Sequence, residues 1–127
     1  MNEQMNSPIE EKYLCEIYYT VERNGYARIS ELAKFLNVSA SSVSRMATRL
    51  NESKLIDFER YGIITLTKKG LLEGKKLARR REILVQLYRV FGIEERYVEK
   101  EVKNIENQIS DHVIGKIELF LKGKQGH

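Results

Sequence analysis

Residues 29–50 read ISELAKFLNVSASSVSRMATRL, two short runs with helical apolar spacing on either side of a tight turn. Ser39 follows the turn at Asn37-Val38 and can cap a helix that runs from about residue 40 to residue 51. Within that helix the apolar positions recur at helical spacing, at Val43, Met46, Ala47 and Leu50. A helix, a turn and a second helix of these lengths predict a helix-turn-helix unit.

A β-hairpin is predicted directly after this unit. Residues 55–59 and 63–66 have the composition of short strands, and Arg60-Tyr61-Gly62 between them is typical of a turn. A hairpin that follows a helix-turn-helix forms a wing, here at about residues 55–66. Together with a helix that begins at Ser7-Pro8 and ends at Asn24-Gly25, these elements predict a winged-helix DNA-binding domain over residues 1–70.

The remaining residues, 71–127, are predicted to form an all-helical dimerisation domain. A long helix from about residue 68 to residue 91 connects it to the first domain, and the chain contains a single proline. The helices of this region carry more apolar residues than one thin layer can hide, namely Ile83, Leu84, Leu87, Tyr88, Ile105, Ile109, Ile114, Ile117 and Phe120. We therefore expect a homodimer, the alternative being that these residues only close the core of this domain. The predicted fold class is mainly α.

Composition and charge limit the classes of function. The 127 residues contain one cysteine, Cys15, and no apolar run of membrane-spanning length, so we expect a cytoplasmic protein without membrane contact. No glycine-rich phosphate loop and no common catalytic motif is present, which argues against an enzyme. Residues 40–81 hold 11 Lys and Arg against 4 Asp and Glu, although the net charge of the chain is only +4. A basic region of this kind indicates double-stranded DNA as the partner.

The outer face of the helix at residues 40–51 has the residue types that a DNA-reading helix needs. Small side chains allow close approach to the bases, hydroxyl groups bind bases or phosphates, and arginine binds guanine or phosphate. We expect base contacts from Ser41, Ser42 and Arg45. We expect phosphate or wing contacts from Ser39, Ser44, Thr48, Arg49, Arg28, Arg60 and Tyr61. The alternatives are an ordinary polar helix face and, for Tyr61, packing within the hairpin.

Four segments of the chain resemble one family. They are GYARIS at 25–30, VSASSVS at 38–44, LTKKG at 66–70 and IENQIS at 105–110. Together they are similar to the diphtheria-toxin-repressor-type metalloregulators, in the manganese transport regulator branch, and the resemblance covers about residues 8–121. It implies a homodimeric winged-helix repressor that binds Mn²⁺ or Fe²⁺ through carboxylates and histidines.

The positions that the resemblance aligns with metal ligands hold other residues here. The first helix of the family supplies an Asp and a Glu, the long helix a His, and the next helix the motif Glu-x-x-Glu-His. In this chain the corresponding positions hold Lys12, Cys15, Arg81, Lys103, Glu106 and Asn107. Only Glu106 is an ordinary ligand, and protonated lysine and arginine cannot bind a cation. We therefore expect no metal cofactor, and a sequence-specific transcriptional repressor that works without metal.

Several hypotheses remain open for this remnant effector site. Lys12 could pair with Glu106, or Arg81 with Glu16, which would connect the first helix to the C-terminal domain and keep the protein in its DNA-competent arrangement. The same cations could instead bind an anionic metabolite, a metal could bind at a non-standard site, or the site could have lost all function. Cys15 could act as a redox thiol. The alternative from another class is a protein-interaction dimer that does not bind DNA.

Overall fold

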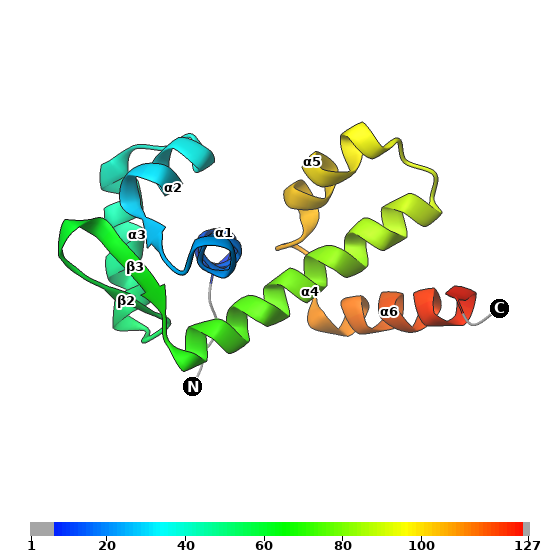
Figure 1. The fold of residues 1–127 in the computed structure, drawn as a ribbon. Coiled ribbons are helices and arrows are strands. Elements are labelled where there is room, and N and C mark those ends of the chain that lie inside the picture. The colour runs from blue at the N-terminus through cyan, green and yellow to red at the C-terminus, as the bar shows by residue number, and fades with distance from the viewer. Residues whose placement is uncertain (1–6, 126–127) are drawn as a thin grey trace. The chain divides into compact units, whose positions relative to one another are not determined.

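The structure, a computed structural model, describes the backbone of residues 7–125 and the side chains of all of these except Arg60 and Gln125. Contacts divide the chain into two compact units, one up to Leu77 and one from Ala78 onward. The elements, labelled in Figure 1, are α1 (Pro8–Asn24), β1 (Ala27–Arg28), α2 (Ile29–Leu36), α3 (Ala40–Glu52), β2 (Ile56–Phe58), a 3₁₀ turn (Arg60–Gly62), β3 (Ile63–Leu66), α4 (Lys68–Val90), α5 (Glu95–Ile105) and α6 (Asp111–Gln125).

The N-terminal unit has the predicted winged-helix architecture, and the prediction of a mainly α fold is confirmed. Ser7 and Glu10 form a reciprocal capping box at the start of α1, and Gly25 ends this helix in the left-handed conformation (φ 86°). Between α2 and α3, Asn37 takes the left-handed conformation at φ 59° and begins the predicted turn. The core of the unit lies between the three helices and the sheet, with fully buried Leu14, Ile17, Leu32, Val43, Leu50, Leu55, Ile56 and Ile64.

The sheet has one strand more than the sequence predicts. Its order is β1-β3-β2, with both pairs antiparallel. In the wing Ile56 lies opposite Leu66, and in the added strand Ala27 lies opposite Ile64. Because β1 has only two residues, it shows no alternation of apolar and polar side chains. It nevertheless places Arg28 opposite Ile63, the first residue after the turn of the wing.

Two glycines bring the first turns of α4 close to the rest of the N-terminal unit. Thr67 caps this helix, because its hydroxyl oxygen accepts a hydrogen bond from the Gly70 amide at 2.9 Å. A Cβ atom on Gly70 would lie 1.8 Å from the Leu55 carbonyl oxygen, and one on Gly74 would lie 2.7 Å from the Tyr18 ring. The absence of side chains at these two positions therefore allows α4 to pack closely on the Leu55 backbone and on the Tyr18 side chain.

The C-terminal unit contains the rest of α4 together with α5 and α6, which lie on either side of α4 in Figure 1. Its core consists of Ile83, Leu84, Val98, Val102, Ile114 and Leu121. Gly92, at φ 83°, ends α4 as predicted, and the Ser110 hydroxyl caps α6 by accepting a hydrogen bond from the Val113 amide at 3.2 Å. Among residues 7–125, no helix is both long enough and apolar enough to cross a membrane.

Not all apolar residues of the C-terminal unit enter its core. Ile83, Leu84 and Ile114 do, in agreement with the alternative that these residues close the core of their own domain. By contrast, other large apolar side chains of this unit stay at its surface, among them Phe91 (63% exposed), Leu119 (63%), Phe120 (50%), Tyr97 (46%) and Val113 (44%).

Replacing Gly70 by alanine is expected to destabilise the protein by about 3 kcal/mol or more, because the new methyl group would collide with backbone atoms that cannot move aside. Thermal unfolding followed by circular dichroism measures the effect. The matched control is Gly115→Ala in α6, where nothing lies within 4 Å of the added Cβ. There alanine is expected to stabilise by about 0.5–1 kcal/mol through its higher helix propensity. Equal melting temperatures for the two variants would contradict the close approach at Gly70.

Candidate nucleic-acid interface and remnant effector site

Helix α3 buries one side and exposes the other. Val43, Met46, Ala47 and Leu50 are buried, whereas Ser41, Arg45, Thr48 and Arg49 are exposed. The exposed residues share one face of the helix because they recur three and four positions apart. The face that the sequence predicts as the DNA-reading face is therefore at the surface.

The serines at the start of α3 form a connected group of hydroxyls. The Ser39 oxygen accepts a hydrogen bond from the Ser42 amide at 3.1 Å, which caps the helix. It also lies 2.9 Å from the Ser42 hydroxyl and 3.1 Å from that of Ser41. Arg45 donates to the Ser42 hydroxyl at 3.3 Å, so its guanidinium lies along this end of the helix. A helix start that exposes amides, hydroxyls and a guanidinium favours negatively charged ligands.

Farther along the same face, two predicted DNA contacts already have partners within the chain. The Thr48 hydroxyl donates to the Ser44 carbonyl at 3.0 Å, as threonine often does inside a helix. Arg49 forms an ion pair with Glu10 at 3.3 Å, and its side chain remains 59% exposed. Glu10 also belongs to the capping box of α1. Glu10 could not be predicted as the partner of Arg49 from the sequence, because a capping residue gives no indication of a long-range partner.

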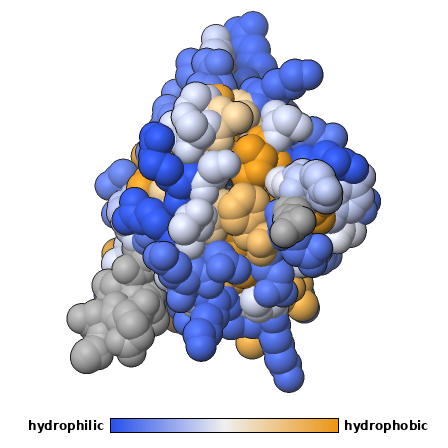
Figure 2. Space-filling model, turned by 90° about the vertical axis from the view of Figure 1, so that its left-hand side faces the viewer, coloured by the Kyte–Doolittle hydropathy of each residue, from blue (hydrophilic) through white to orange (hydrophobic). Residues whose placement is uncertain are grey.

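A concave surface of about 320 Å³ lies beside the start of α3. The residues that line it come from β1, α2, α3 and the wing, namely Arg28, Ile29, Ser30, Ala40, Ser44, Phe58, Tyr61 and Gly62. Three predicted contact residues, Arg28, Ser44 and Tyr61, thus meet at one hollow. Figure 2 shows the side of the molecule that includes the wing as mostly hydrophilic, with a hydrophobic strip in its middle.

Tyr61 is an unusual residue in the wing. It is 91% exposed and has a positive φ of 67°, which a residue with a Cβ rarely adopts. Packing inside the hairpin, the alternative considered from sequence, does not agree with this exposure. Arg28 lies with its guanidinium 5.1 Å from the centre of the Tyr26 ring, which holds it at the edge of the hollow. The side chain of the remaining wing residue, Arg60, lies outside the described part of the structure.

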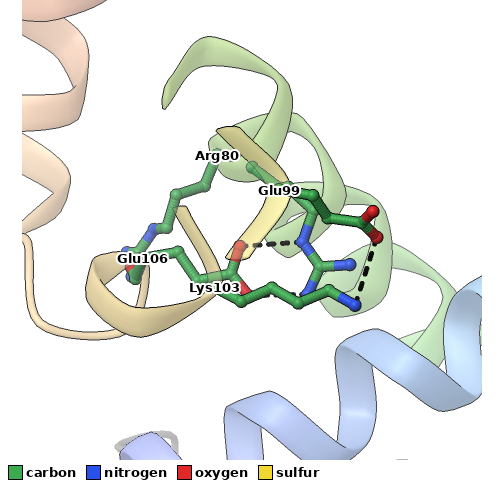
Figure 3. A network of polar contacts seen from close by, with 5 residues as sticks. Arg80, Glu99, Lys103 and Glu106 are labelled. Atoms are coloured by element: carbon green, nitrogen blue, oxygen red, sulfur yellow. Dashed lines mark hydrogen bonds and ion pairs between the residues drawn. The ribbon is translucent and has the colours of Figure 1, made fainter. Parts of the chain in front are cut away.

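In the C-terminal unit, Arg81 and Glu106 form a two-pronged ion pair. Arg81 Nε donates to Glu106 Oε1 at 2.8 Å, and Arg81 Nη2 donates to Glu106 Oε2 at 2.6 Å. Both side chains are nearly buried, at 12% and 3% exposure. Close by, Lys103 pairs with Glu99 at 3.3 Å (Figure 3). Two of the cations that the sequence analysis placed in the remnant effector site are thus paired with carboxylates.

Arg80, which was not predicted from the sequence, contributes to the same network. Its side chain lies beside Glu106 in Figure 3 and donates to the Glu106 carbonyl oxygen at 3.0 Å. It also pairs with Asp111 at the start of α6. The only signal in the sequence was the run Arg79-Arg80-Arg81, which does not identify which arginine turns toward α5.

Of the other residues of the predicted site, Asn107 follows Glu106 in the C-terminal unit, whereas Lys12 and Cys15 belong to the N-terminal unit. On α1, Lys12 is exposed, Cys15 is buried at 1% exposure and Glu16 is buried at 4%. The pairings of Lys12 with Glu106 and of Arg81 with Glu16 stay predictions. The pair between Arg81 and Glu106 was not among the hypotheses from sequence, although it joins two of the residues that they named.

The residues of this region do not fit a metal ion. Among residues 7–125, no three His, Cys, Asp or Glu side chains come together in a group that could hold one. Asn107 is a weak ligand, and both oxygens of the Glu106 carboxylate already accept hydrogen bonds from Arg81. An arginine in direct contact with the buried carboxylate would also repel a dication.

Comparisons with known proteins agree with the two-part organisation. Residues 5–64 match the family model of the iron dependent repressor N-terminal DNA binding domain. Residues 67–125 match that of the iron dependent repressor metal binding and dimerisation domain. The chain is 39% identical over 113 residues to the HTH-type transcriptional regulator MntR of Shouchella clausii, covering 89% of this chain and 79% of the relative. It is 37% identical to the protein of the same name from Bacillus subtilis, over 89% of this chain and 80% of the relative.

Solved structures show the same likeness. The structure of T. acidophilum IdeR has a TM-score of 0.77 and 27% identity, covering 97% of this chain and 56% of that one. The manganese regulator SloR has a TM-score of 0.75 and 27% identity, covering 89% of this chain and 53% of that one. The chain therefore spans about half the length of these two proteins.

Replacing Ser39 by alanine is expected to lower the free energy of unfolding by about 1 kcal/mol, because the Ser42 amide loses its cap. Denaturation by urea, followed by circular dichroism, measures the change. The control is Ser41→Ala, which removes an exposed hydroxyl that caps nothing and is expected to change stability by less than about 0.5 kcal/mol. If Ser39→Ala were as stable as the wild type, the cap described above would be wrong.

Proposed function

The chain belongs to the iron dependent repressor family, and from this we propose that it is a homodimeric transcriptional repressor whose binding to double-stranded DNA needs no metal ion. That it is a DNA-binding transcription regulator and not an enzyme follows from the family itself. The dimer, the contact residues and the independence from metal are our proposal. In this proposal residues 1–70 bind DNA, and residues 71–127 form the dimer.

The exposed face of α3 is the observation that carries the proposal for DNA. We assign base contacts to Ser41, Ser42 and Arg45, because they lie at the start of the helix, where small side chains leave room for the base edges. We assign contacts to the phosphate backbone to Ser39, Ser44, Thr48, Arg49, Arg28, Arg60 and Tyr61. The hollow between α3 and the wing supports this assignment, since Arg28, Ser44 and Tyr61 line it together.

The proposed dimer is supported by the surface of the C-terminal unit. Phe91, Leu119 and Phe120 are each at least half exposed, which is unfavourable for a surface that faces water. The family model that matches this region is named for dimerisation. A two-fold dimer also presents two recognition helices to two half-sites, which raises affinity and specificity together.

The proposal of metal independence is supported by the side chains that replace ligands. Lys12 and Lys103 are cations, and Arg81 is bound to the one carboxylate of the set, Glu106. The anion-responsive alternative has lost support as well, since Arg81 and Lys103 each pair with a carboxylate of the chain. The alternative of a dimer that does not bind DNA would leave the hydroxyl and arginine face of α3 without a role.

The proposed function is tested by fluorescence anisotropy with the full chain and a labelled duplex from the region upstream of its own gene. We expect tight binding of two chains per site, with affinities in EDTA and in Mn²⁺, Fe²⁺ or Zn²⁺ that agree within about twofold, or ~0.4 kcal/mol. All titrations are made at one salt concentration, because phosphate contacts make the affinity depend on salt. Binding that appears only with added metal would overturn the metal independence. The absence of any DNA binding would overturn the proposal as a whole.

The two arginines of α3 are expected to differ in their roles. Arg45→Ala should weaken operator binding by about 1–3 kcal/mol and reduce the preference for operator over unrelated DNA, because Arg45 reads bases. Arg49→Ala should weaken binding to both kinds of DNA equally and lower the salt slope by about 1, because it contacts a phosphate. Competition anisotropy with operator and random duplexes measures both effects. Equal loss of preference in the two variants would contradict the division of roles.

A further inference from the structure

Glu106 is the most deeply buried acidic residue of the C-terminal unit among those described, at 2% exposure. It stands directly after α5, as the residue that ends this helix. A carboxylate in such a place loses its hydration, which destabilises the folded protein unless a cation or several donors replace the water. The unit must therefore supply a cation or several hydrogen-bond donors to Glu106.

Arg81 supplies that charge in the geometry that suits a carboxylate best. Its Nε and Nη2 each donate to one oxygen, at 2.8 and 2.6 Å, so both oxygens are bound by one planar group. The preceding residue, Arg80, donates to the backbone carbonyl of Glu106 and pairs with Asp111. Two consecutive arginines of α4 thus bind the end of α5 and the start of α6.

This ion pair differs from what the name of the matching family model would lead one to expect. The matching model over residues 67–125 describes a metal binding domain, yet the donors of this chain do not fit a metal. We propose that the guanidinium of Arg81 takes over the task of the metal in the C-terminal unit, as a permanent internal cation that neutralises Glu106 and joins α4 to α5. The consequence for DNA binding rests on the proposed function, whereas the consequence for stability does not.

Arginine is suited to this task and lysine is not. A guanidinium stays protonated throughout the physiological range and presents its donors in a fixed plane, so it fixes direction as well as charge. The chain contains a second pair of the same kind for comparison. Arg89 binds Glu95 through Nε at 3.0 Å and Nη2 at 2.6 Å, but both side chains are more than half exposed. Arg89 holds the pKa of Glu95 below its usual value through this hydrogen bond.

The test compares Arg81→Ala with Arg89→Ala in the full chain, by thermal unfolding and DNA anisotropy. Arg81→Ala leaves a buried carboxylate unpaired, and its melting temperature should fall by about 10 °C or more. Arg89→Ala breaks an exposed pair and should change it by less than about 3 °C. Wild-type protein should melt at the same temperature in EDTA and in millimolar Mn²⁺ or Zn²⁺.

Chemical rescue distinguishes an internal cation from ordinary packing. Millimolar ethylguanidinium chloride replaces the atoms that Arg81→Ala removes, and it should restore part of the lost melting temperature and DNA affinity while leaving the wild type and Arg89→Ala unchanged. If Arg81→Ala does not fold, the double variant Arg81→Met/Glu106→Leu replaces it. This variant should melt within about 5 °C of the wild type, because no charge is left uncompensated.

Three outcomes would overturn the inference: an Arg81→Ala protein with wild-type stability, a double variant as unstable as the single one, or a wild type that metal stabilises. A wild type that unfolds as expected but binds no DNA would refute the proposed function and leave the role of Arg81 intact.

Discussion

The architecture of the N-terminal unit depends on the burial of one side of α3. Val43, Met46, Ala47 and Leu50 pack against α1, α2 and the sheet, and burying each of the larger side chains contributes about 1.5–3 kcal/mol. This packing fixes the rotation of the helix about its own axis, and rotation determines which residues reach the surface. The serines and arginines of α3 are exposed because the opposite, apolar side of the helix is buried in the core. The turn before α3 and the wing after it then limit its position along the axis.

Much of the fold follows from local sequence signals. The capping residues Ser7, Ser39 and Thr67 and the left-handed Gly25 and Gly92 start or end helices where the sequence predicts. The wing was equally predictable, since two short apolar strands flank a turn that contains glycine. The helices predicted at about residues 40–51 and 68–91 are α3 at Ala40–Glu52 and α4 at Lys68–Val90, so their ends agree to within one residue. Strand β1 was not predicted, because its two residues are a strand only through their pairing with Ile63–Ile64, which lie far along the chain.

For the candidate site too, features set by local sequence could be predicted, whereas contacts between distant residues could not. Which side chains occupy the positions that resemble metal ligands could be read from the chain alone, whereas the expected absence of a metal cofactor stays a prediction. The sequence does not show which acid each cation binds. Arg81 and Glu106 are 25 positions apart, and on charge alone Glu16 was an equally reasonable partner for Arg81. Arg80 shows the limit most clearly. The three residues Arg79-Arg80-Arg81 have the same side chain and differ only in the direction in which they project from α4. Arg80 binds a backbone carbonyl oxygen, and such an acceptor is present at every residue, so the sequence does not identify it.

The pair between Arg81 and Glu106 has a consequence for how such a repressor can respond to its surroundings. A solute that binds reversibly has a dissociation constant, so the fraction of sites it fills reports its concentration. A guanidinium that is covalently part of α4 is present once for every Glu106 and never diffuses away. A site filled in this manner carries no information about the cell. In a dimeric repressor without another effector, the number of chains is the variable that remains, and at low abundance the dimer population grows with its square. Control would then pass from ion homeostasis to synthesis and turnover.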